Sequence, residues 1–175
     1  MTRLTKFVER SIRATEDAAG AGDRQLAVLK KLRIVIRAAQ RHSTWIEKRC
    51  GLNGAQLWIM QELYEAPGLR VGEIADKLAI HQTTASNLLR PLERRGYLVK
   101  ERDAQDKRAV KLVLSEQGMA LLAQAPKPAR GLLPEALRQS DAAELASLDA
   151  GLEGLLNSMG VVDEAYGLEP LPFNM

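Results

Sequence analysis

The chain has 175 residues, of which 46% are hydrophobic, and this is enough to bury one good core and a dimer seam. It contains no apolar run of about 18 residues, and its N-terminus lacks the apolar centre of a secretory signal, so we expect no membrane span and no export. The single cysteine, Cys50, excludes an internal disulfide framework and fits the reducing cytoplasm, where we expect the protein.

The net charge of +3 is unevenly distributed along the sequence. Residues 77–111 hold 9 Lys/Arg and 4 Asp/Glu, a net of +5, whereas residues 112–175 hold 3 and 9, a net of −6. A basic segment of this kind favours a polyanion as its partner. The alternative is a chance fluctuation in the charges of a solvated surface.

The N-terminal part predicts a polar extension followed by one long helix. We assign residues 1–25 to the extension, although Leu4, Phe7, Val8 and Ile12 leave a short amphipathic helix open. We assign residues 26–52 to a first dimerisation helix, which Gly51 stops. Apolar residues step along it by three and four in one seam. The seam consists of Leu29, Leu32, Ile36, Ala39, Ser43 and Ile46.

The next segment carries a strong helix-start signal. Asn53 is expected at the N-cap with Gln56 at the third helical position, a variant of the capping box. Leu52 and Leu57 occupy the positions of a hydrophobic staple around this cap. The helix is expected to end at Pro67-Gly68.

Two short helices and a hairpin follow. One face of the first helix holds Val71, Ile74, Ala75 and Leu78, and one face of the second holds Ala85, Leu88, Leu89 and Leu92. Gly96 ends the second helix, because the position after a helix end favours a positive φ. The period then changes to two over residues 98–102 and 110–114, which predicts two strands joined by a turn at DAQDK. We assign residues 53–114 to a winged helix-turn-helix DNA-binding domain.

Residues 115–160 predict C-terminal dimerisation helices. One helix begins at Ser115, and Pro126, Pro128 and Pro134 predict a break near residues 125–134. The last helix opens at Asp141 and closes at Gly160, and residues 161–175 are expected to be a loosely held tail. The apolar stripe of the last helix has heptad spacing and needs a partner surface, which predicts a homodimer. The stripe consists of Leu145, Leu148, Leu152, Leu155 and Met159.

The expected fold is therefore mainly α with a small β-hairpin wing, flanked by dimerisation helices at both ends. This order of elements resembles the MarR family of bacterial transcriptional regulators, over roughly residues 26–160. The most specific strings are IADKLAIHQTTAS and LERRGYLVKERDAQDKRAVKLVLSEQG, the second with Asp106 and Arg108. Pro91 inside the second helix of the motif, and the three later prolines, depart from the usual pattern.

The resemblance implies a homodimer on pseudo-palindromic double-stranded DNA. In that arrangement the second helix of the motif, the recognition helix, enters the major groove and each wing reaches the adjacent minor groove. Many such proteins repress transcription and release DNA when a small, often aromatic, ligand or an oxidant arrives. A regulator of this type needs no cofactor.

The candidate DNA-binding residues lie on the recognition helix and the wing. Short amides and hydroxyls at a helix start contact base edges or phosphates, or else they are simply solvated caps. Arg90, Arg94 and Arg95 are ambiguous between phosphate contacts and a solvated face. Lys107 and Arg108 suit a narrow minor groove, with Asp106 supporting the turn. The helix-start candidates are Gln82, Thr83, Thr84, Ser86 and Asn87.

Ligand-binding candidates lie near the junction of the first two long helices: His42, Trp45, Trp58 and Tyr64. Aromatic residues at helical spacing belong to a core more often than to a ligand site. Cys50 follows a helix end, away from where the family's sensor cysteines lie, so a buried thiol is favoured over a redox sensor.

The sequence does not favour an enzyme. It has two histidines, no zinc-spaced Cys/His cluster, no Gly-rich phosphate loop and no nucleophile elbow, so we expect neither catalysis nor a metal. His81 precedes the recognition helix and is expected to cap it. Two alternatives stay open: a ligand-independent architectural DNA binder, and a winged-helix protein-interaction module. The charged wing, KERDAQDKR, disfavours the module.

Overall fold

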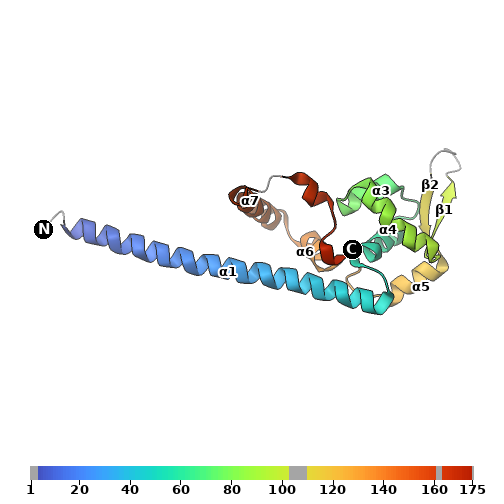
Figure 1. The fold of residues 1–175 in the computed structure, drawn as a ribbon, viewed down its shortest axis with the longest axis horizontal. Helices are drawn as coiled ribbons and strands as arrows, with labels where there is room; N and C mark the ends of the chain where they lie inside the picture. The colour runs from blue at the N-terminus through green and yellow to red at the C-terminus, as the bar shows by residue number, and fades with distance from the viewer. Residues whose placement is uncertain (1–3, 103–109, 161–162, 175) are drawn as a thin grey trace. The chain divides into compact units, whose positions relative to one another are not determined.

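The computed structural model describes residues 4–102, 110–160 and 163–174, and of residues 4–21 and 164 the backbone alone (Figure 1). The described residues are mostly helical, with one antiparallel hairpin, which confirms the predicted fold class. The elements are α1 (Leu4–Cys50), α2 (Gly54–Glu65), α3 (Val71–Leu78), α4 (Gln82–Arg94), β1 (Leu98–Arg102), β2 (Val110–Leu114), α5 (Glu116–Gln124), α6 (Leu132–Gln139), α7 (Ala142–Met159) and two 3₁₀ turns, η1 (Glu164–Leu168) and η2 (Pro172–Asn174).

Helix α1 differs from its prediction at the N-terminal end. It begins at Leu4, so the boundary expected between residues 25 and 26 lies inside a helix. Gly20 and Gly22 lie within the helix, although each glycine costs a helix about 1 kcal/mol relative to alanine. The alanines and long polar side chains around them are good helix formers and sustain the helix. The chain divides into two compact units, Met1–Ala38 and Ala39–Met175, and the features described below belong to the second.

The predicted end of α1 and the predicted N-terminal cap of α2 are both present in the structure. Gly51 has φ +64° directly after α1, and the Asn53 side chain accepts the Gln56 N–H at 2.8 Å while Gln56 Oε1 accepts the Asn53 N–H at 3.1 Å. Leu52 and Leu57, the staple pair, are both buried. These contacts fix the direction in which the chain enters α2.

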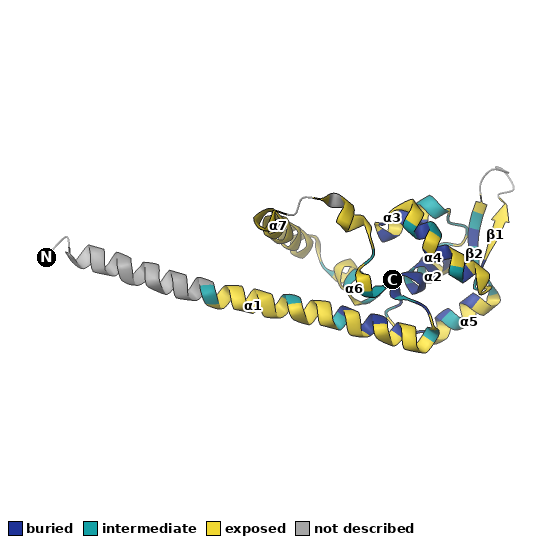
Figure 2. Cartoon of the chain, in the orientation of Figure 1, coloured by how far each residue is buried: buried dark blue, intermediate teal, exposed yellow. Residues whose placement is uncertain are grey.

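The core of the second unit is built around α2, which Figure 2 shows as largely buried. Helices α3 and α4 each bury the apolar face that the 3.6-residue period predicts. The largest fully buried side chains are Ile46, Leu52, Leu57, Ile59, Met60, Leu63, Ile74, Leu92, Leu98 and Leu112.

The hairpin has the predicted strand bounds, with Leu98 opposite Leu114 and Arg102 opposite Val110. Its turn lies outside the described residues. Only the base of the hairpin joins the core, through Leu98 and Leu112. Leu112 also pairs with the segment before α3, because its N–H donates to the Leu69 carbonyl at 3.0 Å and its carbonyl accepts the Gly68 N–H at 2.9 Å.

Gly118 fixes α5 against the start of β1. A Cβ at this position would lie 2.0 Å from the Tyr97 carbonyl oxygen, a backbone atom that has no room to move aside. The cap of α5 adds two bonds at the same place: the Ser115 N–H donates to the Tyr97 carbonyl at 3.1 Å and its hydroxyl to the Gly96 carbonyl at 2.6 Å. The base of the wing is therefore clamped between α4 and α5.

The proline-rich segment breaks the C-terminal helices as predicted, between Gln124 and Leu132. Pro134 does not contribute to the break: it lies in the first turn of α6, where its missing N–H removes no helical bond. Helix α7 has the predicted cap, Asp141 with Glu144, and the predicted stop at Gly160 with φ +67°. None of the helices described is both long and apolar enough to span a bilayer.

The tail differs most from its prediction. We expected it to be loosely held, but residues 163–174 form η1 and η2 and are tied to α1, α2 and α4 by the contacts described below (Figure 1).

Candidate nucleic-acid interface

The turn between α3 and α4 orients the second helix of the motif. Ala79 has φ +52°, a left-handed conformation that costs a side chain with a Cβ about 1–2 kcal/mol. The buried Ile80 offsets this cost, and its N–H donates to the Ala75 carbonyl at 3.0 Å. His81 takes the N-cap position, as expected, but its side chain makes no capping bond. Its backbone N–H donates instead to the Leu168 carbonyl in the tail, at 3.1 Å.

Helix α4 buries its apolar face and presents the predicted polar residues on the opposite face. Thr84 and Ser86 are half-buried. The Ser86 hydroxyl donates to the Gln82 carbonyl at 2.9 Å, which leaves its oxygen able to accept. Pro91 has no N–H for the Asn87 carbonyl, yet the helix continues to Arg94. The exposed members of the predicted set are Gln82, Thr83, Asn87, Arg90 and Arg94.

Some cations near this surface are already engaged. Arg95 Nη1 donates to the Gly51 carbonyl at 2.5 Å, which joins the end of α4 to the end of α1. Lys100 Nζ pairs with Glu93 Oε2 at 2.7 Å, between β1 and α4. The predicted wing residues Asp106, Lys107 and Arg108 lie outside the described residues.

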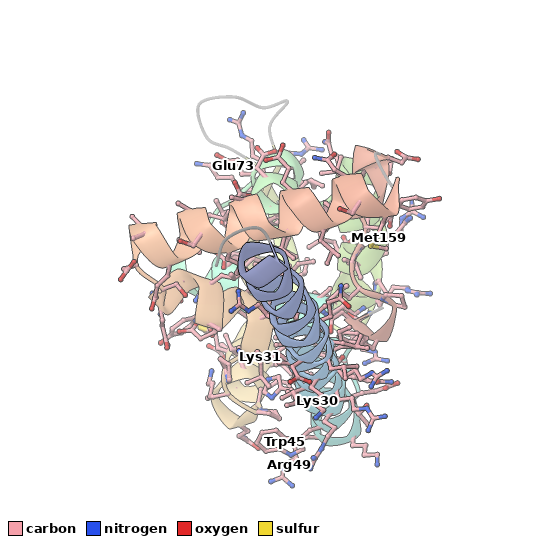
Figure 3. All side chains as sticks on the ribbon, turned by 90° about the vertical axis from the view of Figure 1, so that its left-hand side faces the viewer. Lys30, Lys31, Trp45, Arg49, Glu73 and Met159 are labelled. Atoms are coloured by element: carbon pink, nitrogen blue, oxygen red, sulfur yellow. The ribbon has the colours of Figure 1, made fainter. Side chains whose placement is uncertain are left out.

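The four predicted ligand residues do not form one pocket. His42 is buried, 2.9 Å from the Pro128 carbonyl through Nε2, and it meets Trp45 edge-on at 5.8 Å. Trp45 and Tyr64 are more than half exposed. Figure 3 shows Trp45 beside Arg49 on the C-terminal part of α1. Trp58 lines the cavity described next, and His42, Trp45 and Tyr64 are not among the residues of its walls.

That cavity has a volume of about 350 Å³ and mostly apolar walls. The walls come from α1, α2, the α3–α4 turn, α6 and the tail, which are distant in sequence, so no local pattern predicts the cavity. One side touches Leu78, Ala79 and Ile80, the residues that orient α4. The remaining contributors include Ala55, Trp58, Leu132, Leu133, Leu137, Pro170 and Leu171.

A buried ion network lies beside the cavity. Glu62 is 5% exposed and accepts Arg130 Nε at 2.7 Å and Trp58 Nε1 at 2.9 Å, with Lys77 Nζ at 3.3 Å. Burial works against ionisation, but the bonds from Arg130, Trp58 and Lys77 outweigh it and lower the pKa of Glu62. Arg130 also pairs with Glu65 at 2.5 Å and lowers the pKa of that carboxyl to about 2. The network joins α2, α3 and the segment between α5 and α6.

Cys50 is half-buried, and burial raises the pKa of its thiol above the usual value, with Arg49 opposing. A sensor cysteine needs a lowered pKa, because the thiolate is the species that reacts. This environment therefore agrees with the expected unreactive thiol.

Residues 51–109 match the family model described as MarR family. Among curated proteins, the chain is 29% identical over 91 residues to the uncharacterized HTH-type transcriptional regulator YybA of Bacillus subtilis, covering 52% of this chain and 61% of that protein. It is 37% identical over 78 residues to the HTH-type transcriptional regulator Hpr of Bacillus cytotoxicus, covering 45% and 42%. The chain thus spans about half the length of the curated relatives it matches.

Two solved structures show the same fold. The regulator BldR of Sulfolobus solfataricus superposes with a TM-score of 0.51 at 22% identity, over 78% of this chain and 96% of that one. PcaV of Streptomyces coelicolor, solved with its natural ligand, gives 0.50 at 22% identity, over 72% and 91%. The architecture defines a winged helix-turn-helix protein. The match of residues 51–109 to the MarR family model agrees with the resemblance that the sequence indicated.

Proposed function

We propose that the protein is a dimeric, sequence-specific DNA-binding transcriptional regulator of the repressor type. The observation that carries this proposal is α4, which is anchored by its buried leucines and presents short polar side chains on its exposed face. Amides and hydroxyls of this length suit base edges in the major groove. The relatives named above as regulators support the same function. A regulator acts where the chromosome is, which places it in the cytoplasm.

In this proposal the wing contributes affinity more than sequence choice. Lys107 and Arg108 enter the adjacent minor groove, where a narrow groove concentrates negative potential, and Asp106 supports the turn. Arg90 and Arg94 contact phosphates beside the major groove and set the position of α4.

Asn87→Ala is expected to cost about 1–3 kcal/mol on the preferred duplex and to relax the choice of base at one position in each half-site. The wild-type protein first selects duplexes from a random pool, and both proteins are then titrated with the selected and a scrambled duplex. Asn87 is exposed, so its loss leaves the core of α4 intact. Equal sequence preference in the two proteins would contradict the assigned role, and failure to enrich any duplex would contradict the proposed function.

Sedimentation at micromolar concentration is expected to give about twice the monomer mass of 19.3 kDa. The reason is the stripe on α7, where Leu148 is 47% and Leu152 is 42% exposed, since leucines at heptad spacing need a partner surface. The double change Leu148→Glu and Leu152→Glu should give a folded monomer. A wild-type monomer that binds the selected duplex with full affinity would contradict the dimer.

We also propose that the 350 Å³ cavity holds a small aromatic effector. Its contact with the α3–α4 turn supports this, because an occupant that displaces Ala79 or Ile80 changes the direction of α4. The competing function is an architectural DNA binder that responds to no ligand. A thermal-shift screen with small aromatic acids separates the two.

A further inference from the structure

The tail lies against the start of α4, on the surface proposed to read DNA. The Leu168 carbonyl accepts the His81 N–H at 3.1 Å, directly before the helix. One residue later, the Glu169 carboxylate oxygens lie 3.4 and 3.5 Å from the Thr84 hydroxyl. These are long contacts for a hydroxyl donor, but they place a negative charge over the first turn of the recognition helix.

The tail is also anchored at its far end. The Phe173 carbonyl accepts the Ser43 hydroxyl of α1, and the Asn174 side chain packs so closely on α2 that a Cβ at Gly54 would lie 2.9 Å from its Oδ1. Pro170 and Leu171, between the two anchors, cover the cavity. The tail is therefore a strap held at α1 and α2 on one side and at α4 on the other.

The strap is acidic, whereas the helix-turn-helix and wing segment that it contacts at the start of α4 is basic in total sequence charge. Residues 163–174 contain Asp163, Glu164 and Glu169 and no Lys or Arg, whereas residues 77–111 have a net charge of +5. Glu169 also lies near the N-terminus of α4, where backbone N–H groups favour a negative charge. If the start of α4 reads DNA as proposed, the Glu169 carboxylate lies on the side of Thr84 where a phosphate or a base edge would bind.

We infer that the C-terminal strap is an autoinhibitory segment, which competes with DNA for the start of α4 and leaves it when DNA binds. This inference rests on the proposed DNA-binding function. The inference also predicts whether a ligand in the cavity strengthens or weakens DNA binding. One wall of the cavity consists of strap residues, so an occupant contacts the strap only while the strap is docked. These residues are Gly167, Glu169, Pro170 and Leu171. A ligand in the cavity therefore stabilises the docked strap and weakens DNA binding, and DNA weakens the binding of the ligand by the same factor.

The test compares Glu169→Gln with Glu153→Gln in the full-length protein. Both changes remove one negative charge, but Glu153 lies on the exposed surface of α7, so long-range electrostatics cancel in the comparison. The probe is a fluorescent duplex selected from a random pool by the wild-type protein. Glu169→Gln should bind the duplex roughly threefold to tenfold more tightly than Glu153→Gln. This size follows from the energy of exposed charge contacts, counted twice because a dimer has two straps.

Backbone hydrogen exchange of the wild-type protein provides the second readout. Exchange in the peptide spanning residues 163–174 should become faster when saturating duplex is added, because the strap is released. Equal affinities of the two variants together with unchanged exchange would overturn the strap and leave DNA binding intact. Tighter binding by Glu169→Gln with unchanged exchange would also overturn it, since the carboxylate would then act from a docked tail. If wild type and Glu169→Gln both fail to enrich any duplex, the proposed function falls, and the strap with it.

Discussion

Raising the salt concentration from 50 to 200 mM is expected to weaken binding to the selected duplex by roughly 10³–10⁵-fold, for a dimer that neutralises about 6–10 phosphates. Each neutralised phosphate releases condensed counterions, and added salt opposes that release. The structure places exposed Arg90 and Arg94 on α4, within a segment of net charge +5 per subunit. Fluorescence anisotropy titrations at five or six salt concentrations give the slope.

A matched pair of variants identifies the cations responsible for the slope. Arg90→Ala should reduce it by about one per subunit. Lys100→Ala removes the same charge, but Lys100 is already paired with Glu93 at 2.7 Å, so its effect on the slope should be smaller. A flat salt response, or equal slopes for the two variants, would show that the exposed face of α4 is not the phosphate-binding surface.

The parts of the fold that could be predicted from sequence are those whose signals are local. The capping box at Asn53 and Gln56 joins residues three apart, and Gly51, Gly96 and Gly160 each follow a helix end at positive φ. The strands of the wing were predicted because the hydrophobic period changes from 3.6 to 2 within a few residues. Contacts of this range depend little on the rest of the chain.

The parts that could not be predicted depend on residues distant in sequence. Glu62 lies 68 residues from Arg130, and as a glutamate in the middle of a helix it gave no sign of being buried. Thr84 lies 85 residues from Glu169, and the tail, rich in proline and acidic residues, has the composition of a free terminus. Trp58 was identified as a ligand candidate, but the cavity it lines is completed by α6 and the tail. Tertiary packing determined each of these features.

The network around Glu62 predicts the largest change in stability. Arg130→Met is expected to lower the free energy of unfolding by about 2–4 kcal/mol, because it removes one partner of a buried ion pair and leaves the carboxylate charged. The value lies at the lower end for such pairs, since Lys77 and Trp58 stay in contact with Glu62 and Arg130 itself is 15% exposed. Methionine keeps most of the apolar volume of the arginine side chain. Urea unfolding of both proteins at neutral pH measures the difference.

Arg138→Met is the matched control. Arg138 pairs with Glu135 at 2.7 Å but is 62% exposed, so solvent screens the pair and its loss should lower the free energy of unfolding much less than the loss of Arg130. The pH dependence of the difference in free energy of unfolding tests whether the ion pairs of Arg130 cause it. Hydrogen bonds from Arg130 first and Gln61 second lower the pKa of Glu65 from 4.5 to about 2, and Arg130 contributes to the lowered pKa of Glu62. A carboxyl with a lowered pKa in the folded state stabilises the protein above its ordinary pKa, and this stabilisation is lost as the pH falls toward the folded-state value.

The difference in free energy of unfolding between wild type and Arg130→Met should therefore be full at pH 6–7 and shrink as the pH falls from about 4.5 toward 2. A difference that stays constant down to pH 3, or one no larger than that of Arg138→Met, would show that packing, and not the charge of Glu62, determines the effect.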